Sequence, residues 1–233
     1  MRLAGKRLGA LEGRRGGVKI YSVKEAYVTL QGEGAQTGRA AVFLRFAGCN
    51  LWSGLERDRA SAVCRFCDTD FVGTDGENGG KFEGPGALAR HVRALWDEGE
   101  RSQARPYVVC TGGEPLLQLD PPLIDTLHGE GFEIGVETNG TLETPAGLDW
   151  ICVSPKANAT LVQKRGNELK LVYPQDEAEA QPERFETLDF SHFFLQPKDA
   201  PDQAANIAAA AKYCLKNPRW RLSLQTHKLI GLP

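Results

Sequence analysis

The chain has 233 residues, a formal net charge of −2, and 41% hydrophobic and 25% charged residues. These values are typical of one globular domain with a substantial core. The small acidic balance argues against a general nucleic-acid binder. No apolar run approaches the ~20 residues that span a bilayer, and the N-terminus lacks the apolar stretch of a signal peptide. We therefore expect a cytoplasmic protein with no nucleic-acid partner and no membrane partner.

Residues 1–20 differ in composition from the rest of the chain. They are rich in Gly, Arg and Lys and show neither a helical nor a strand period. We expect a basic, disordered leader here, with a nucleic-acid or membrane tail as the alternative. Residues 21–233 are expected to form one domain, with an insertion at about 50–80.

The remainder of the chain alternates strand-like and helix-like segments. Helical spacing of apolar residues predicts helices over 85–98, 121–130 and 202–216. Strands are predicted over 24–30, 40–46, 106–110, 132–138, 149–153, 168–173, 192–196 and 220–225. This alternation predicts an α/β fold with a mostly parallel sheet and few outer helices, arranged as a partial (open) β/α barrel. In such a sheet the site lies at the carboxyl ends of the strands.

Residues 50–80 interrupt this pattern with a long connection that carries only short apolar runs. Loops of this length in compact domains are usually functional or disordered. This loop contains Cys64 and Cys67, so we expect it to be functional.

Three cysteines carry the first chemical signal. Fourteen residues separate Cys49 from Cys64, and two separate Cys64 from Cys67. Three thiolates can hold a [4Fe–4S] cluster and leave its fourth iron open. A closed zinc site needs a fourth ligand, and no His or further Cys lies at a familiar spacing. A redox dithiol would not need Cys49. The pattern favours an iron–sulfur cluster, with zinc and a dithiol as alternatives.

The segment from Thr111 to Pro115, TGGEP, directly follows a predicted strand. Two glycines at a strand end let the backbone approach a ligand without interference from a Cβ atom. Alone, the motif also fits a tight turn. It is not a phosphate-binding loop, because no Gly-Lys-Ser/Thr follows.

Together with the three cysteines, this segment resembles the radical S-adenosylmethionine (radical SAM) enzymes. Further segments resemble 7-carboxy-7-deazaguanine synthase: TLQGEG at 29–34, RFAGCNLW at 45–52, CDTD at 67–70, ETNG at 137–140, SPK at 154–156 and QTHK at 225–228. The resemblance extends from 24 to 233. The superfamily usually has three residues between its first two cysteines. The fourteen found here match a subgroup of the synthase family with an enlarged cluster loop.

The resemblance implies an open barrel of the radical SAM type that binds a [4Fe–4S] cluster, S-adenosylmethionine and Mg²⁺. It implies ring contraction of 6-carboxy-5,6,7,8-tetrahydropterin to 7-carboxy-7-deazaguanine with release of ammonia, a step toward queuosine and related deazapurines. The cofactors carry out the radical chemistry, so no side chain is assigned as certainly catalytic. An electron donor such as flavodoxin or ferredoxin and a homodimer are also implied.

The same resemblance assigns residues to these ligands. The cluster is assigned to Cys49, Cys64 and Cys67, and Mg²⁺ is assigned to Thr69. S-adenosylmethionine is assigned to Phe66, Cys67, Asp68, Gly113, Ser154, Pro155, Lys156, Gln196, Pro197, Lys198 and Asp199. The substrate is assigned to Leu30, Gln31, Gly32, Glu33, Arg45, Thr111, His227 and the terminal carboxylate of Pro233.

Several of these residues have plainer interpretations. Arg45 is either a clamp for the substrate carboxylate or one half of a salt bridge. Thr69 is either a Mg²⁺ ligand or a loop cap, and the ETNG segment at 137–140 is a polar lining or a turn. Two other functions stay open: a radical SAM activase that forms a glycyl radical on a partner protein, and a zinc-stabilised module without catalysis.

Overall fold

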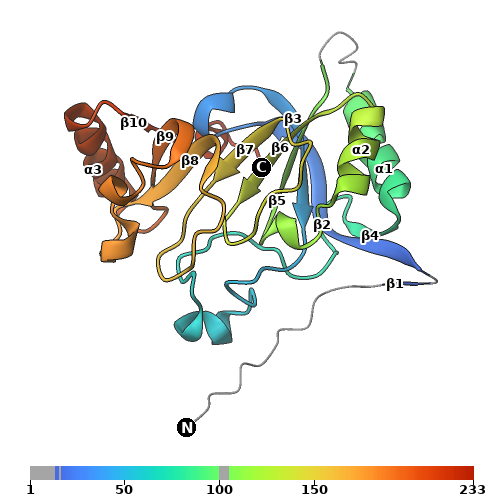
Figure 1. Ribbon diagram of the computed structural model, residues 1–233, viewed down its shortest axis with the longest axis horizontal. Coiled ribbons are helices and arrows are strands. Elements are labelled where there is room, and N and C mark those ends of the chain that lie inside the picture. The colour runs from blue at the N-terminus through green and yellow to red at the C-terminus, as the bar shows by residue number, and fades with distance from the viewer. Residues whose placement is uncertain (1–13, 16, 100–104) are drawn as a thin grey trace.

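The computed structural model of the protein describes residues 14–15, 17–99 and 105–233. Its centre is one twisted sheet, shown in Figure 1. The strands are β1 (Arg14–Arg15), β2 (Val18–Leu30), β3 (Ala40–Phe46), β4 (Gly80–Glu83), β5 (Tyr107–Gly112), β6 (Glu133–Thr138), β7 (Trp150–Val153), β8 (Arg165–Tyr173), β9 (Asp189–Pro197) and β10 (Trp220–Leu222). The α-helices are α1 (Pro85–Asp97), α2 (Pro121–Gly129), α3 (Gln203–Lys216) and α4 (Thr226–Leu229). Short 3₁₀ turns are η1 (Gly34–Gln36), η2 (Glu56–Ser61), η3 (Pro115–Leu117), η4 (Ala178–Ala180) and η5 (Pro182–Arg184).

The strand order is β1-β2-β3-β5-β6-β7-β8-β9-β10, with β4 paired to β2. From β3 to β10 every neighbouring pair is parallel, whereas β2 runs antiparallel to β3. Among the described strands β10 pairs only with β9, so the curved sheet stays open. The predicted α/β fold with a mostly parallel, open sheet is confirmed. Each parallel strand ends at the same edge, where its following loop begins.

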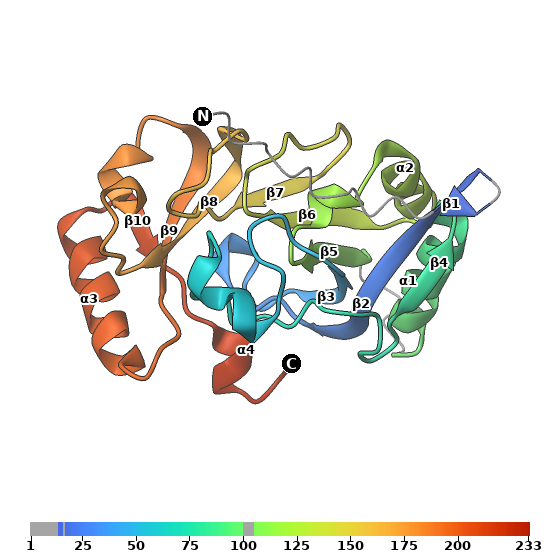
Figure 2. The same ribbon diagram turned by 90° about the horizontal axis from the view of Figure 1, so that it is seen from below.

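Helices cover the outer face of the sheet in two groups, which Figures 1 and 2 place at opposite ends. Helices α1 and α2 pack together near β2 and β6, and α3 packs against β9 and β10. In α1 the apolar residues recur at helical spacing and are buried. In α2 the side chain of Asp120 caps the first turn by accepting from the amide of Leu123 at 3.2 Å. Trp220 anchors the second core, under α3.

Two boundaries differ from the predicted ones. Strand β2 begins at Val18, inside the range predicted as a leader, because its first residues pair with β1 and β4. The remainder of that leader, residues 1–13 and 16, lies outside the described part of the chain. The strand predicted over 220–225 ends at Leu222. Beyond it the amide and hydroxyl of Thr226 bind the carbonyl of Gly32, each at 2.9 Å, and draw the chain away from the sheet into α4.

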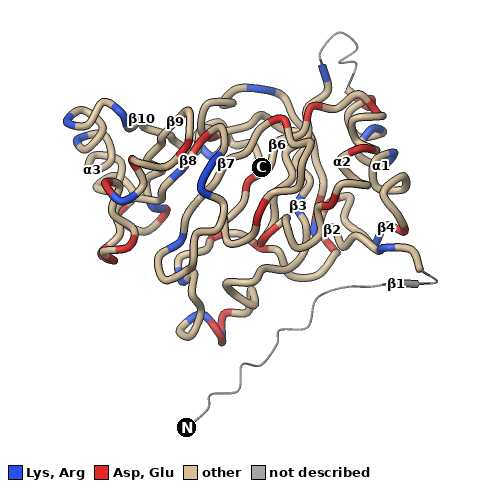
Figure 3. Tube along the Cα trace, viewed as in Figure 1, with Lys and Arg blue, Asp and Glu red and all other residues tan. Residues whose placement is uncertain are grey.

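Charged residues are distributed along the whole fold. Figure 3 shows acidic and basic residues interspersed over both ends of the molecule and also on strands of the sheet. No helix within the described residues is both long and apolar enough to cross a membrane.

Truncating a buried residue of α2 tests the packing of the first core. Leu123 is 0% exposed, whereas Leu215 on α3 is 87% exposed. Leu123→Ala is expected to lower the free energy of unfolding by about 2–5 kcal/mol, because it removes buried methyl groups and leaves a cavity. The control Leu215→Ala should change it by less than about 0.5 kcal/mol. Urea denaturation followed by circular dichroism measures both, and equal effects would contradict this packing.

Candidate active site

A pocket of about 610 Å³ opens at the carboxyl edge of the sheet. Residues at the ends of β3, β5, β6, β7, β8 and β9 line it, together with the long loop after β3 and the C-terminal segment. Its volume is in the usual range for sites that enclose small molecules. Figure 2 shows the loop and α4 side by side against the sheet. The ends of six parallel strands therefore converge on one cavity.

The three cysteines meet at one end of this pocket, and each lines it. Cys49 follows β3, while Cys64 and Cys67 return from the long loop. The Sγ atom of Cys49 accepts from the amide of Leu51 at 3.4 Å. The other cysteines of the chain, Cys110, Cys152 and Cys214, do not line the pocket. The structure thus supplies three thiols here, which suits a [4Fe–4S] cluster with one open iron better than a closed zinc site.

Arg59 organises the loop that carries two of these cysteines. Its guanidinium donates to the carbonyls of Arg65 at 2.9 Å and Cys67 at 3.1 Å. It also stacks over the Trp52 ring, 4.1 Å from the ring centroid. One side chain therefore brackets the Cys-x-x-Cys segment, in a loop whose only regular piece among the described residues is the short turn η2, Glu56–Ser61.

The three thiols have different pKa values. A hydrogen bond between the two side chains raises the pKa of Cys64 and lowers that of Cys67 to about 6. The positive charge of Lys156 lowers the pKa of both. Burial raises the pKa of Cys49. Thiolates are the form that binds iron, so Lys156 favours the binding form of this pair.

The Gly112–Gly113 turn packs directly against the turn that carries Cys49. A Cβ atom on Gly113 would lie 2.3 Å from the carbonyl oxygen of Gly48 and 2.7 Å from Cβ of Cys49. Gly112 has φ of 144°, and a Cβ there would lie 2.3 Å from the carbonyl oxygen of Phe46. The sequence TGGEP is thus a close backbone approach and not only a turn.

The residues assigned to S-adenosylmethionine surround the cysteine end of the pocket. The ammonium of Lys156 donates to the carbonyl and the hydroxyl of Ser154, both at 2.7 Å. Lys198 lies over the Phe66 ring, 5.8 Å from its centroid. The members of this set that line the pocket are Phe66, Cys67, Asp68, Gly113, Ser154, Lys156, Gln196, Pro197 and Asp199, whereas Pro155 and Lys198 do not.

Most of the residues assigned to the substrate line the same pocket. They are Leu30, Gln31, Glu33, Arg45, Thr111, His227 and Pro233, and Thr69 of the loop lines it as well. Gly32 does not line it. A Cβ on Gly32 would lie 1.9 Å from Nδ1 of His227, so this glycine makes room for the histidine. Arg45 donates to Oε1 of Glu25 at 2.7 Å and to the Tyr27 hydroxyl at 3.3 Å. Arg45 therefore forms a salt bridge and also lines the cavity.

The C-terminal segment, residues 225–233, closes one side of the pocket. The ammonium of Lys228 binds the carboxylates of Asp68, at 3.0 Å, and Asp199, at 2.5 Å. The Thr29 hydroxyl donates to the carbonyl oxygen of Pro233 at 3.2 Å. Burial lowers the pKa of His227. This segment therefore bridges the cysteine loop, the end of β9 and the end of β2.

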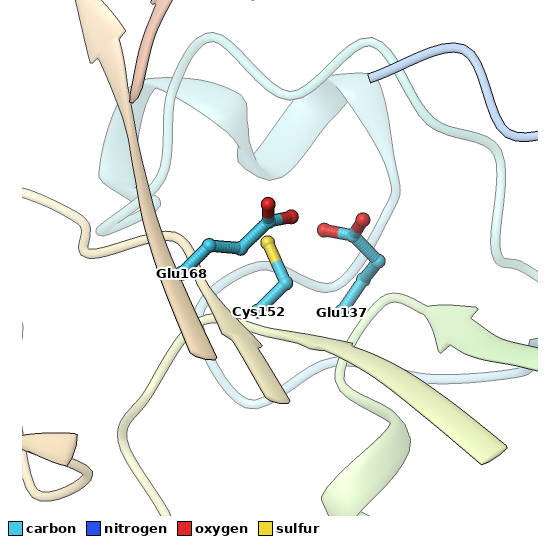
Figure 4. Close-up of side chains that lie close together, drawn as sticks. All are labelled: Glu137, Cys152 and Glu168. Atoms are coloured by element: carbon cyan, nitrogen blue, oxygen red, sulfur yellow. The ribbon is translucent and has the colours of Figure 1, made fainter. Parts of the chain in front are cut away.

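A charged cluster at the pocket wall contains three residues that the sequence reasoning missed, Cys152, Glu168 and Lys170. Figure 4 shows Glu137, Cys152 and Glu168 pointing toward one another, with ligand atoms within 4.8 Å. Lys170 is 2.8 Å from Glu137 and 2.6 Å from Glu33, so an ammonium already supplies the cation of this cluster. Glu168 and Lys170 are two residues apart on β8 and share its inner face. The sequence signal for this cluster is a pair of charged residues at alternate positions of the otherwise apolar strand β8.

Electrostatics within the cluster follow from burial and this ammonium. Burial alone would raise the pKa of Glu33, but the charge of Lys170 and its hydrogen bond lower it overall. Burial would likewise lower the pKa of Lys170, yet the surrounding acidic groups hold it well above its usual value. Burial and the charge of Glu137 raise the pKa of Glu168, and burial raises that of Cys152. Lys170 is thus held in its charged form, and burial makes ionisation of Glu168 less favourable.

Known proteins resemble the chain over most of its length. The 7-carboxy-7-deazaguanine synthase of Caulobacter vibrioides is 64% identical over 213 residues, which cover 91% of this chain and 99% of that protein. The chain belongs to the 7-carboxy-7-deazaguanine synthase family. The member from Bordetella pertussis is 62% identical with the same coverage. No family model matches the chain.

A solved structure agrees with this assignment. The crystal structure of QueE from Escherichia coli matches with a TM-score of 0.64 and 28% identity, over 88% of this chain and 93% of that one. The open radical SAM barrel predicted from the sequence is confirmed, as is the family. The cofactors of the family are a [4Fe–4S] cluster and S-adenosylmethionine, and the three thiols described above fit the cluster.

Adding one methyl group at position 113 tests how closely the turn after β5 must pack against the turn that carries Cys49. Gly113→Ala is expected to lower the affinity for S-adenosylmethionine at least about 10-fold, or about 1.4 kcal/mol, because the new Cβ displaces the Cys49 turn. Gly129→Ala is the control, since a Cβ there meets nothing within 4 Å. Equilibrium dialysis of S-adenosylmethionine and iron content after reconstitution measure both variants. Equal affinities would show that the turns are free to separate.

Proposed function

We propose that the chain catalyses the ring contraction of 6-carboxy-5,6,7,8-tetrahydropterin to 7-carboxy-7-deazaguanine, with release of ammonia, in the synthesis of queuosine and related deazapurines. The observation that carries this proposal is that three thiols and a set of charged side chains, Arg45 and Glu33 among them, line one pocket of about 610 Å³. These two sets differ in chemistry, as two different ligands would require.

At the cysteine end, Cys49, Cys64 and Cys67 would hold the [4Fe–4S] cluster. Asp68, Gly113, Ser154, Lys156 and the Gln196–Asp199 turn would hold S-adenosylmethionine, with Phe66 beside it. When bound, these two groups supply a carbon radical that removes a hydrogen atom from the substrate. The backbone at Gly113 fixes the methionine part because no side chain intervenes there.

At the other end, the chain's own residues bind and orient the pterin. Arg45 keeps guanidinium donors available beside its bond to Glu25, and a guanidinium fork matches a carboxylate. Gln31, Glu33, His227 and the backbone at Leu30 and Gly32 would bind the ring, with Thr111 beneath it. The C-terminal segment through Pro233 covers this end and limits the access of water.

Three further features belong to this proposal. Thr69 lines the pocket, and its hydroxyl would be a suitable ligand for a Mg²⁺ that also contacts the substrate. A one-electron carrier such as flavodoxin or ferredoxin would reduce the cluster. A homodimer is supported by the exposed apolar side chains of the C-terminal segment, of which Leu229 is 73% and Ile230 61% exposed.

An anaerobic assay tests the reaction. Reconstituted protein is given S-adenosylmethionine, a strong reductant, Mg²⁺ and 6-carboxytetrahydropterin, and mass spectrometry follows 7-carboxy-7-deazaguanine. We expect product without stoichiometric loss of S-adenosylmethionine. Cys64→Ala should abolish product and the reductive cleavage of S-adenosylmethionine, whereas Cys214→Ala, on α3 and outside the pocket, should retain both. No product from the wild type with its cluster verified would refute the proposed function.

A conservative change tests the carboxylate clamp. Arg45→Lys keeps the charge but loses the planar fork, so KM for the pterin should rise roughly 10- to 100-fold. Arg39→Lys is the control, because Arg39 forms a comparable pair with Glu133 at 2.8 Å outside the pocket lining. Steady-state kinetics separates the two variants. An unchanged KM in Arg45→Lys would leave Arg45 with its salt bridge alone.

A further inference from the structure

Lys170 joins two carboxylates that arrive from different parts of the chain. Its side chain is 6% exposed, and Nζ lies 2.6 Å from Oε2 of Glu33 and 2.8 Å from Oε2 of Glu137. Glu33 stands between β2 and β3, and Glu137 is near the end of β6. All three residues line the pocket. A buried ammonium therefore fixes two acceptors side by side on one wall.

The second oxygen of each carboxylate is fixed as well. Gln31 donates to Oε1 of Glu137 at 3.1 Å, and Gln225 donates to Oε1 of Glu33 at 3.0 Å. A carboxylate oxygen has two lone pairs, so each retains capacity for another donor. The two carboxylates and one ammonium carry a net charge of −1. This wall of the pocket thus suits a ligand edge rich in N–H groups.

Glu168 and Cys152 complete the surroundings of Lys170. Glu168 accepts from the amide of Ala35 at 2.8 Å and lies beside Cys152. Burial raises the pKa of both groups. The groups that face the ammonium or Glu33 are then Glu137 from β6, Cys152 from β7, Glu168 from β8 and His227 from α4. Of these carboxylates, Glu33 and Glu137 are the ones in ion-pair contact with Lys170.

We propose that Lys170 is a positioning residue, which holds Glu33 and Glu137 as a matched pair of acceptors for the N–H edge of the substrate's pyrimidine ring. This inference rests on the proposed function. The 2-amino-4-oxopyrimidine part of the pterin presents its exocyclic amine and the neighbouring ring N3–H side by side, and both are donors. A ring that presents acceptors at this edge would face two carboxylates without hydrogen bonds, which selects against it.

The variant Lys170→Met removes the ammonium and keeps most of the volume. We expect KM for 6-carboxytetrahydropterin to rise roughly 10- to 100-fold, with a smaller change in kcat. Binding of the fluorescent analogue 6-carboxypterin should weaken by a similar factor. Lys164→Met, an exposed lysine just before β8, is the matched control and should match the wild type. Wild-type KM and analogue affinity in Lys170→Met would overturn the proposal.

A pH series separates positioning from general damage. In the wild type the pKa of Glu33 is lowered, so Glu33 stays ionised from pH 6 to 8. Without Lys170 the strongest effects opposing burial are lost and the pKa of Glu33 rises, so the variant loses its acceptor as the pH falls. The ratio of the variant's KM to that of the wild type should therefore be larger at pH 6 than at pH 8. The charge of Lys170 also lowers the pKa of His227, so that pKa rises in the variant as well. A constant ratio would overturn the proposal.

A double-mutant cycle tests whether Lys170 acts through the carboxylates, and Glu137→Gln alone, which should also raise KM for the pterin, covers the case in which Lys170→Met does not fold. Glu137→Gln with Lys170→Met removes one carboxylate together with the ammonium. Because Lys170 acts through the carboxylates, the rise in KM from Lys170→Met should be smaller in the Glu137→Gln background, and a fully additive rise would overturn this role. A wild type that makes no product refutes the proposed function. Failure of these variants to alter pterin binding refutes the role of Lys170 alone.

Discussion

The position of Cys49 depends on how closely the turn after β3 packs against the turn after β5. Glu114 donates its amide to the carbonyl of Gly48 at 3.0 Å, and the lack of a side chain at Gly113 lets the two backbones meet. The buried carboxyl of Glu114 then binds the Thr138 hydroxyl and the Asn139 amide, both at 2.8 Å. Three neighbouring strand ends are thus tied into one rigid edge, and Cys49 is fixed to it.

Two lysines divide the pocket into regions of different electrostatic character. Lys156 stands near the thiols and favours their ionised form, as a metal-binding pair requires. Lys170 stabilises the carboxylates of Glu33 and Glu137. Both lysines are at carboxyl-edge positions of neighbouring strands, β7 and β8. The same sheet edge therefore carries a group of thiols and a group of carboxylates, while the apolar core stays on the helical face.

Much of the fold and part of the site were predictable because their signals are local. Apolar strands, helical spacing and the pairing of Cys64 with Cys67 are read within short windows. Lys170 and Glu168 were missed because each looks like an ordinary charge in a strand, and only the curvature of the sheet turns that face toward Glu33 and Glu137. The helix α4 was missed for a similar reason: Thr226, just beyond the predicted strand, binds Gly32, a partner 194 residues away.

The unusual separation of Cys49 from Cys64 has a small thermodynamic consequence. Both ends of the loop are held independently, one by the rigid strand edge and the other by the contacts of Arg59 with Arg65 and Cys67. Loop-closure entropy grows only with the logarithm of length, so fourteen residues in place of three cost about 1.4 kcal/mol. That amount is comparable to one hydrogen bond. A change in the length of this loop therefore costs little folding free energy, as long as both of its anchors are kept.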